Sequence, residues 1–241
     1  MLVLLRHGES SLNEEGRFSG WTDCPLTAEG ERQAHASGRI LRDAGVGFDV
    51  CFTSVLSRAM NTAAIVLGEL GLSDIPVTKT WRLNERHYGV LEGCLRKDIA
   101  ERYGIDRMEA WRNTPDATPP PLGTADMRHP RHKAAYGDVP PDLLPASECL
   151  RDAFRRVTDF FEAEIRPLVE SGRGVLVVSH GNPIRGLIAH LEGFSAGKMP
   201  MIEIRNADPI VYLPGHSGKF ANVPIDGTVL TGRWMSADVR L

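Results

Sequence analysis

The chain has 241 residues and a formal net charge of −3, which argues against non-specific binding to nucleic acid. Its hydrophobic content of 42% and charged content of 24% are typical of a soluble globular protein, and at this length we expect one domain spanning residues 1–241. No membrane-length apolar run or leader-like pattern occurs. The four cysteines are scattered, which favours a cytoplasmic protein over a disulfide framework or a zinc cluster.

A short apolar run at residues 2–5 ends in the sequence RHGES at residues 6–10. Such a run predicts a buried strand, and the carboxyl ends of parallel strands are where ligands bind. There, His7 is a candidate nucleophile and Arg6 a candidate anion clamp, because neutral imidazole attacks phosphorus and guanidinium binds phosphate oxygens in pairs. For an isolated Arg-His pair, a histidine satisfied by backbone is the commoner explanation.

Helix and strand patterns then alternate up to residue 81. They predict a helix capped by Thr27 that runs to about Ala44, a strand at 50–53, a helix at 55–68 and a strand at 75–81. Arg58 falls in the first turn of the second helix, after a strand that delivers Ser54. This alternation predicts an α/β fold, a three-layer sandwich with a mostly parallel central sheet flanked by helices.

Between about residues 94 and 145 the periodicity weakens and proline becomes frequent, including PPP at 119–121. We expect this segment to be an insertion that caps the carboxyl edge of the sheet. A capped helix from Ser147 to about Val169 then returns the chain to the core.

A second histidine has almost the same setting as His7. The apolar run at 174–178 leads into SHGNP at 179–183, and apolar residues then recur at helical spacing up to residue 191. Asn182 suits the N-cap of this helix, and Pro183 suits its first turn. His180 is thus expected between a strand end and a helix N-terminus, where free amides and the helix dipole favour a phosphate group.

These motifs resemble the histidine phosphatase superfamily, also called phosphoglycerate mutase-like, and more closely its 2,3-bisphosphoglycerate-dependent phosphoglycerate mutases. The matching segments follow the family's order over roughly the first four-fifths of the chain: 6–13, 18–23, 25–30, 53–59, 83–89, 111–112 and 179–182. The first and last are common to the whole superfamily. LNERHYG at 83–89 is more specific to the mutases.

The resemblance implies a reaction as well as a fold. His7 would form a phosphohistidine, Arg6, Arg58 and His180 would surround the transferred phosphoryl group, and Glu85 would be the general acid and base. The implied enzyme interconverts 3-phosphoglycerate and 2-phosphoglycerate, is primed by 2,3-bisphosphoglycerate and needs no metal. No residue cluster here has convincing metal-ligand spacing.

The resemblance also implies a set of substrate-binding residues. These are Arg6, Asn13, Ser19, Gly20, Arg58, Glu85, Arg86, Tyr88, Arg96, Arg112, Asn113, Gly181 and Asn182. His87 receives no role, and we expect Trp21 and Trp111 to pack in the core or the cap. A small phosphorylated substrate and a homodimer are the implied partners, without nucleic acid or membrane.

Three positions depart from the mutase pattern. Arg96, followed by Lys97, stands where the mutases carry lysine, and Asn113 stands where they carry a second successive arginine. The sequence NADP at 206–209 replaces a turn that contains Thr-Gly. These departures leave open a phosphatase or mutase of the same fold that acts on another phosphorylated metabolite. A catalytically idle binding module is disfavoured, because His7, Arg6, Glu85 and His180 are all present.

Overall fold

The computed structural model describes residues 1–194 and 203–213, together with three short strands farther along the chain. Its main sheet has the strand order β3-β2-β4-β1-β5-β8, and β6 and β7 form a separate pair. The strands are β1 Leu2–Arg6, β2 Val50–Thr53, β3 Val77–Lys79, β4 Val175–Ser179, β5 Ile210–Tyr212, β6 Val223–Ile225, β7 Thr228–Leu230 and β8 Arg233–Trp234. Strands β1 to β4 run parallel, whereas β5 and β8 pair antiparallel, so the predicted mostly parallel sheet is confirmed.

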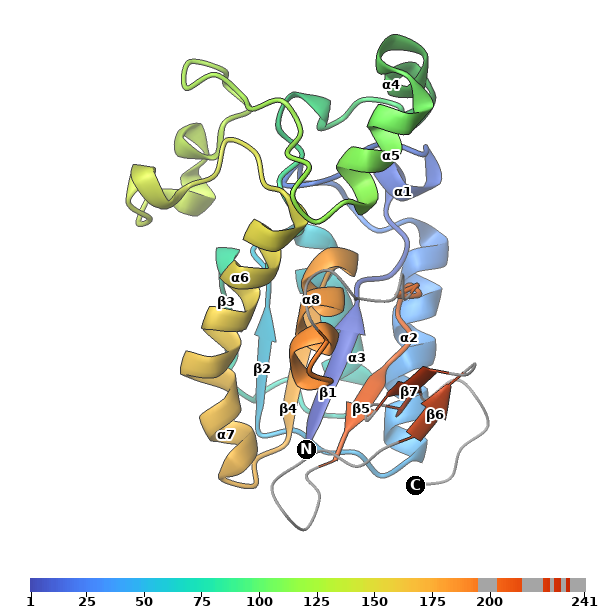
Figure 1. Ribbon diagram of the computed structural model, residues 1–241. Coiled ribbons are helices and arrows are strands. Elements are labelled where there is room, and N and C mark those ends of the chain that lie inside the picture. Colours follow the sequence, from blue (N-terminus) through green and yellow to red (C-terminus); the bar gives the residue numbers. More distant parts are fainter. Residues whose placement is uncertain (195–202, 214–222, 226–227, 231–232, 235–241) are drawn as a thin grey trace.

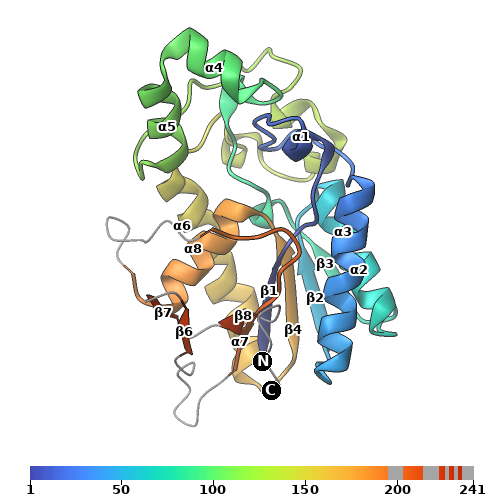
Figure 2. The ribbon, with the colours of Figure 1, turned by 90° about the vertical axis from the view of Figure 1, so that its right-hand side faces the viewer.

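Helices cover both faces of this sheet, which makes the predicted three layers (Figures 1 and 2). The α-helices are α1 Ser11–Glu14, α2 Ala28–Asp43, α3 Ser57–Glu69, α4 Arg96–Tyr103, α5 Ile105–Asn113, α6 Leu150–Phe160, α7 Arg166–Glu170 and α8 Gly181–Leu191. Figure 2 shows α2 and α3 on one side of the strands, with α6, α7 and α8 on the other.

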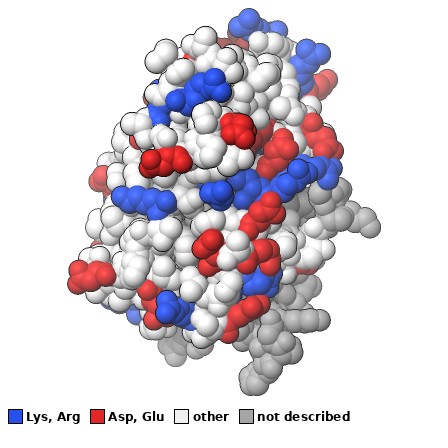
Figure 3. Space-filling model, turned by 90° about the vertical axis from the view of Figure 1, so that its left-hand side faces the viewer, with Lys and Arg blue, Asp and Glu red and all other residues white. Residues whose placement is uncertain are grey.

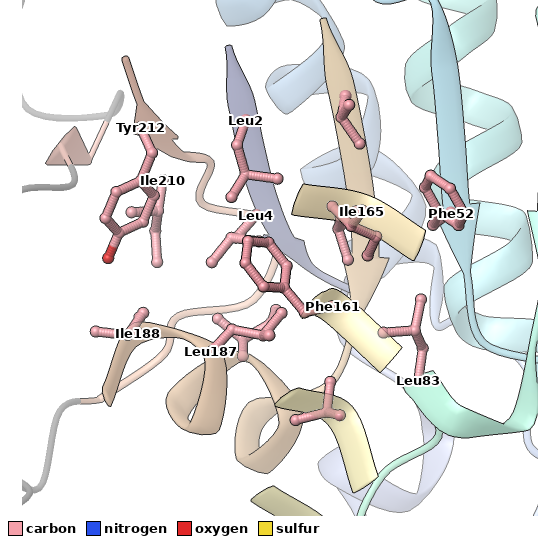
Figure 4. Packing of buried hydrophobic residues seen from close by; sticks show 14 of the residues in the cluster. Leu2, Leu4, Phe52, Leu83, Phe161, Ile165, Leu187, Ile188, Ile210 and Tyr212 are labelled. Atoms are coloured by element: carbon pink, nitrogen blue, oxygen red, sulfur yellow. The ribbon is translucent and has the colours of Figure 1, made fainter. Parts of the chain in front are cut away.

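Strand β1 shows how the sequence produces these layers. Successive side chains of a strand point to opposite faces, so an apolar run buries both of its faces. Leu2 and Leu4 join the cluster that includes α6 and α8, whereas Val3 and Leu5 join the cluster that includes α2 and α3. Figure 4 shows Phe161 packed among residues of the first cluster. Because both faces of β1 are buried, its position in the sheet is fixed, and so is the point at which His7 follows it.

The elements between residues 27 and 81 agree with their predictions, with two adjustments. Thr27 caps α2, and its Oγ1 accepts a hydrogen bond from Gly30 N at 3.0 Å. Helix α3 begins at Ser57, two residues later than predicted, and Arg58 remains in its first turn. The predicted strand at 75–81 is reduced to β3, because this edge strand pairs only with β2 and a 3₁₀ turn begins at Trp81.

The helix predicted from Ser147 begins later and contains an irregularity. Ser147 Oγ donates to Pro119 O at 2.7 Å, and Cys149 is the residue that precedes α6. A π-helical turn at Phe161–Ile165 then joins α6 to α7. Pro167 has no N–H to donate to the residue four positions earlier, which accounts for an interruption at this point.

The insertion at about 94–145 lies beyond the carboxyl ends of the parallel strands, as predicted (Figure 1). It is more regular than its weak periodicity indicates, because it contains α4, α5 and three short 3₁₀ turns. Trp111 packs in one hydrophobic cluster of this region, and Trp21 packs in another with Tyr136. Both tryptophans therefore have the packing role that was expected.

The cysteines, the helix lengths and the surface charges can also be compared with the sequence expectations. The four cysteines are free. None of the helices in the described part of the chain is long and apolar enough to cross a membrane. On the face shown in Figure 3, Lys and Arg side chains are interspersed with Asp and Glu. A single domain spanning residues 1–241 stays a prediction, because parts of the chain after residue 194 lie outside the described residues.

Candidate active site

The register of β1 and β4 brings the two predicted histidines together. Arg6 pairs with Ser179 in parallel, so His7 and His180 each come one residue after this pair, at the carboxyl edge of the sheet. Their ring centroids lie 4.9 Å apart with an interplanar angle of 61°. Their exposed fractions are 3% and 0%. Two distant parts of the sequence thus form one buried histidine pair.

Hydrogen bonds determine which nitrogen of His7 carries the proton. His7 Nδ1 lies 2.6 Å from the carbonyl oxygen of Gly8, and a carbonyl can only accept. In the neutral ring Nδ1 is therefore protonated, and the lone pair is on Nε2. His180 Nε2 lies 2.8 Å from Ser54 Oγ, and its buried Nδ1 has no hydrogen-bond partner.

Burial keeps both histidines uncharged. Burial, followed by the charges of Arg58 and Arg6, lowers the pKa of His7 well below its usual value. Burial and then Arg58 also lower the pKa of His180 well below its usual value. Both rings are therefore neutral at neutral pH, and only neutral imidazole can attack phosphorus.

Two arginines lie beside the histidine pair. Fully buried Arg58 donates to two carbonyls of the loop that precedes α2, from Nη1 to Thr22 O at 2.9 Å and from Nη2 to Gly20 O at 2.8 Å. Arg6 donates from Nη1 to Ile204 O at 2.6 Å. The Nε atom of each arginine is buried without a hydrogen-bond partner, as expected of groups that bind phosphate oxygens.

Glu85 approaches the site from a different loop, which follows the 3₁₀ turn at Trp81–Leu83. Its Oε1 accepts hydrogen bonds from Arg86 N at 2.7 Å and from Asn182 Nδ2 at 2.9 Å. The prediction of Asn182 as N-cap is wrong, because His180 occupies that position. Instead of capping the helix, the Asn182 amide holds Glu85 against the start of α8.

A cavity of about 340 Å³ lies at this edge of the sheet. Nearly all of the predicted substrate-binding residues line it. They are Arg6, Asn13, Ser19, Gly20, Glu85, Tyr88, Arg96, Arg112, Asn113, Gly181 and Asn182. The exceptions are Arg58 and Arg86, which are buried next to the lining residues, as are the two histidines.

Arg86 packs against one of the lining residues. Its guanidinium lies 4.4 Å from the centre of the Tyr88 ring, and its Nη2 donates to Arg112 O at 3.2 Å. The Nε and Nη1 atoms are buried without hydrogen-bond partners. A direct contact between Arg86 and a substrate stays a prediction.

Arg96 and Asn113, the two cap positions that depart from the mutase pattern, both line the cavity. Arg112 Nη1 and Asn113 Nδ2 share one carboxylate, donating to the two oxygens of Glu109 at 2.8 and 2.7 Å. Arg96 lies at the start of α4, where burial and then the charge of Arg112 lower its pKa. The cavity therefore keeps two arginines at this end, one of them paired with an acid.

The segment at 206–209 donates hydrogen bonds to the backbone of His7 and Arg6. Asn206 Nδ2 donates to His7 O at 2.9 Å, and Ala207 N donates to Arg6 O at 2.9 Å. Ala207 has φ of 48°, in the left-handed region that glycine adopts without strain. The departure from a Thr-Gly turn thus retains the backbone shape of a glycine turn.

Three charged lining residues were not predicted. Arg185 donates from Nη1 to Asn182 Oδ1 at 3.2 Å and lies one helical turn after Gly181, a spacing that could have identified it. Arg17 lies between two of the matching segments. Glu203 belongs to a segment without periodicity, so no sequence signal identifies it.

The cavity carries an excess of positive charge. Among the described residues, its lining contains five arginines and two glutamates. Such a lining favours a small anion with more than one negative group. In the same described residues, no group of three or more His, Cys, Asp or Glu is arranged to hold a metal ion.

A family model for the histidine phosphatase superfamily (branch 1) matches residues 2–222. The chain belongs to this superfamily. It is 47% identical over 211 residues to a 2,3-bisphosphoglycerate-dependent phosphoglycerate mutase of Nitratidesulfovibrio vulgaris, covering 88% of this chain and 85% of that protein. The family predicted from the sequence motifs is confirmed.

Two solved structures have the same fold. The α-ribazole phosphatase from Shigella flexneri matches with a TM-score of 0.65 and 27% identity, covering 89% of this chain and 91% of that one. The phosphoglycerate mutase from Bacillus anthracis matches with a TM-score of 0.64 and 24% identity, covering 91% and 89%. At this level of identity the second likeness concerns the fold alone.

Proposed function

We propose that this protein is a phosphoglycerate mutase that interconverts 3-phosphoglycerate and 2-phosphoglycerate through a phosphohistidine at His7. The observation that carries the proposal is the neutral His7 ring, with its lone pair on Nε2, packed against His180 beside an arginine-rich cavity. The mutase from N. vulgaris, at 47% identity, supports this reaction over others of the superfamily.

In the proposed reaction, His7 Nε2 attacks phosphorus while the bond from phosphorus to the donor oxygen breaks. Arg6 and Arg58 balance the charge on the phosphoryl oxygens, and the neutral His180 ring donates a hydrogen bond to them. Glu85 gives a proton to the departing oxygen and takes one from the hydroxyl that attacks next. Splitting the transfer into two displacements lets the enzyme donate and recover the same group.

The cavity residues suit a bisphosphorylated primer. The Nε atoms of Arg6 and Arg58 and the Nε and Nη1 atoms of Arg86 are buried donors without protein partners, which fits a ligand rich in acceptor oxygens. Arg96 and Arg112 would hold its second phosphate or its carboxylate. When bound, 2,3-bisphosphoglycerate supplies the phosphoryl group that primes His7.

A phosphatase of the same fold is the second candidate. Two observations favour it, the α-ribazole phosphatase at 27% identity and Asn113 in place of a second arginine. In that reaction water would replace the substrate hydroxyl as acceptor. The cap with α4 and α5 disfavours it, because a closed cap excludes water from the reacting groups.

One assay separates the two candidates. The purified protein is offered 3-phosphoglycerate with and without 2,3-bisphosphoglycerate, and 2-phosphoglycerate and free phosphate are followed together. We expect 2-phosphoglycerate to form faster than phosphate, to depend on the primer, and to persist after EDTA treatment. Phosphate as the main product would favour the phosphatase instead. A cytoplasmic location and a homodimer stay predictions.

A further inference from the structure

One arginine holds the loop that carries Glu85. Arg156, on α6, donates hydrogen bonds to four backbone carbonyls, two in the 3₁₀ turn at Trp81–Leu83 and two at the start of the loop that follows it. Its Nη1 donates to Trp81 O at 3.3 Å, Arg82 O at 2.8 Å and Asn84 O at 3.1 Å, and its Nη2 donates to Glu85 O at 3.2 Å. The last of these bonds reaches the main chain of the proposed general acid itself.

The guanidinium is in turn fixed by Glu148. Arg156 Nε donates to Glu148 Oε1 at 2.7 Å and Nη2 donates to Oε2 at 2.8 Å, the two-point geometry of a strong ion pair. The two side chains are only 8% and 5% exposed. Glu148 Oε2 also accepts from His87 N at 2.9 Å. Arg156 therefore holds the loop up to Glu85, and Glu148 holds it two residues later.

The ion pair borders a different hollow from the catalytic cavity. Arg156 and Glu148 are absent from its lining, and both line a separate groove together with Trp81 and Arg82. The loop therefore has the cavity on one side and this ion pair on the other. After burial and the charges of Arg58, His7 and Arg6, the charge of Arg156 also contributes to the lowered pKa of His180. Arg156→Lys keeps this charge, so that substitution tests the position of the loop.

We propose that Arg156, fixed by Glu148, is a positioning residue for Glu85, whose carbonyl oxygen also accepts from Trp21 Nε1 at 2.6 Å. The inference rests on the proposed mutase function, in which Glu85 moves protons. A general acid must lie within hydrogen-bond reach of the oxygen it protonates, and a displacement of about 1 Å can cost about 10²-fold in rate. A planar guanidinium can bind several carbonyls and a carboxylate at once, whereas a lysine ammonium is a point charge with fewer donors.

The test compares Arg156→Lys with Arg155→Lys, a matched control at the exposed neighbouring position on α6. Two rates are measured for each variant. One is the mutase kcat with 3-phosphoglycerate, which needs the proton transfer. The other is single-turnover phosphorylation of His7 by p-nitrophenyl phosphate, whose leaving group needs no proton.

We expect Arg156→Lys to lower the mutase kcat by about tenfold or more while KM and the rate of His7 phosphorylation stay within about twofold. Arg155→Lys should behave as the wild type. In a Glu85→Gln background, Arg156→Lys should cause little further loss of kcat, because both changes act on the same proton transfer. If Arg156→Lys does not fold, Glu148→Gln, which keeps the shape but weakens the ion pair, should give the same pattern.

Equal losses in both rates, or full additivity with Glu85→Gln, would overturn the inference in favour of a merely structural ion pair. An unchanged mutase kcat in a folded Arg156→Lys protein would overturn it as well. Failure of the proposed function gives a different result. The wild type itself would then make no 2-phosphoglycerate, and the inference would fall with that function.

Discussion

The side-chain amide of Asn182 donates a hydrogen bond to Glu85 Oε1 at 2.9 Å. Asn182 lies two residues after His180 on the same helix, so this bond connects the carboxylate to the backbone that carries the second histidine. The two partners come from loops far apart in the sequence. The site is therefore assembled by the packing of α8 against the loop after the Trp81–Leu83 turn, and each side-chain role can be tested separately.

Removal of the Glu85 proton donor should impair turnover more than binding. Glu85→Gln keeps the shape of the side chain but cannot donate or accept the transferred proton, so we expect kcat to fall by about 10²-fold or more. Steady-state kinetics with 3-phosphoglycerate measure this effect. Glu203→Gln, which removes the same charge from the same cavity lining, is the control and should change kcat much less. Equal effects would mean that charge, and not proton transfer, explains Glu85.

Asn113→Arg should strengthen anion binding at the end of the cavity lined by Arg96 and Arg112. A well-formed charge-assisted hydrogen bond contributes about 1.5–3 kcal/mol, but Glu109 is close enough to compete for the new guanidinium. We therefore expect 2,3-bisphosphoglycerate to bind about tenfold more tightly, with a higher ratio of mutase to phosphatase turnover. Calorimetry and the two product assays measure these effects, with Asn113→Gln as the uncharged control. Weaker native turnover without tighter binding would indicate a pocket reshaped for another substrate.

Gly8 should not tolerate a side chain. A Cβ at this position would lie 2.8 Å from the carbonyl carbon of Gly30, so the loop after His7 would have to move away from α2. We expect Gly8→Ala to lower the free energy of unfolding by about 1–3 kcal/mol. At Gly181 the nearest atoms would be 3.8 and 4.0 Å away, so Gly181→Ala should remain near wild-type stability. Equal stabilities in chemical unfolding would contradict this close approach.

Glu92 should make the stability depend on pH. Glu92 is buried next to Gly20, and its Oε1 accepts hydrogen bonds from Trp21 N at 2.9 Å and Tyr88 N at 3.1 Å. Burial nevertheless raises the pKa of Glu92 from 4.5 to about 7. Between these values the folded protein binds a proton that the unfolded chain has released. The stabilisation is therefore complete below about pH 4.5 and is lost as the pH rises to about 7.

Chemical unfolding across this window tests the effect. The free energy of unfolding of the wild type, relative to that of Glu92→Gln, should decrease from pH 4.5 to 7 and then level off. Glu164→Gln, at an exposed position, should keep the wild-type pH dependence. A difference that does not change with pH would show that Glu92 is ionised throughout.

The part of the site that follows directly from strands could be predicted from the sequence. His7 and His180 each end an apolar run, and parallel pairing of β1 with β4 places such residues next to each other. Arg58 was predictable for the same reason, as the start of a helix after a strand. Glu85 lies in a loop without periodicity, so its assignment depended on resemblance alone.

Other features depend on packing that no local pattern encodes. In the sequence, Arg156 does not differ from other arginines on an amphipathic helix. Its role depends on the packing of α6 against the Glu85 loop, where it donates to four backbone carbonyls. Asn182 is a residue type that favours the N-cap, but it lies inside α8, where its Nδ2 donates to Glu85 and its Oδ1 accepts from Arg185. Helices α4 and α5 are short and mostly polar, and their weak hydrophobic pattern did not predict them.

The central claim is that the phosphoryl group passes through His7. The measurement is brief exposure to 2,3-bisphosphoglycerate labelled with ³²P, followed by mapping of the labelled residue and a test of its stability in acid. We predict an acid-labile label on His7 that is lost in His7→Ala together with turnover. A label on His180, or an acid-stable label elsewhere, would contradict the account.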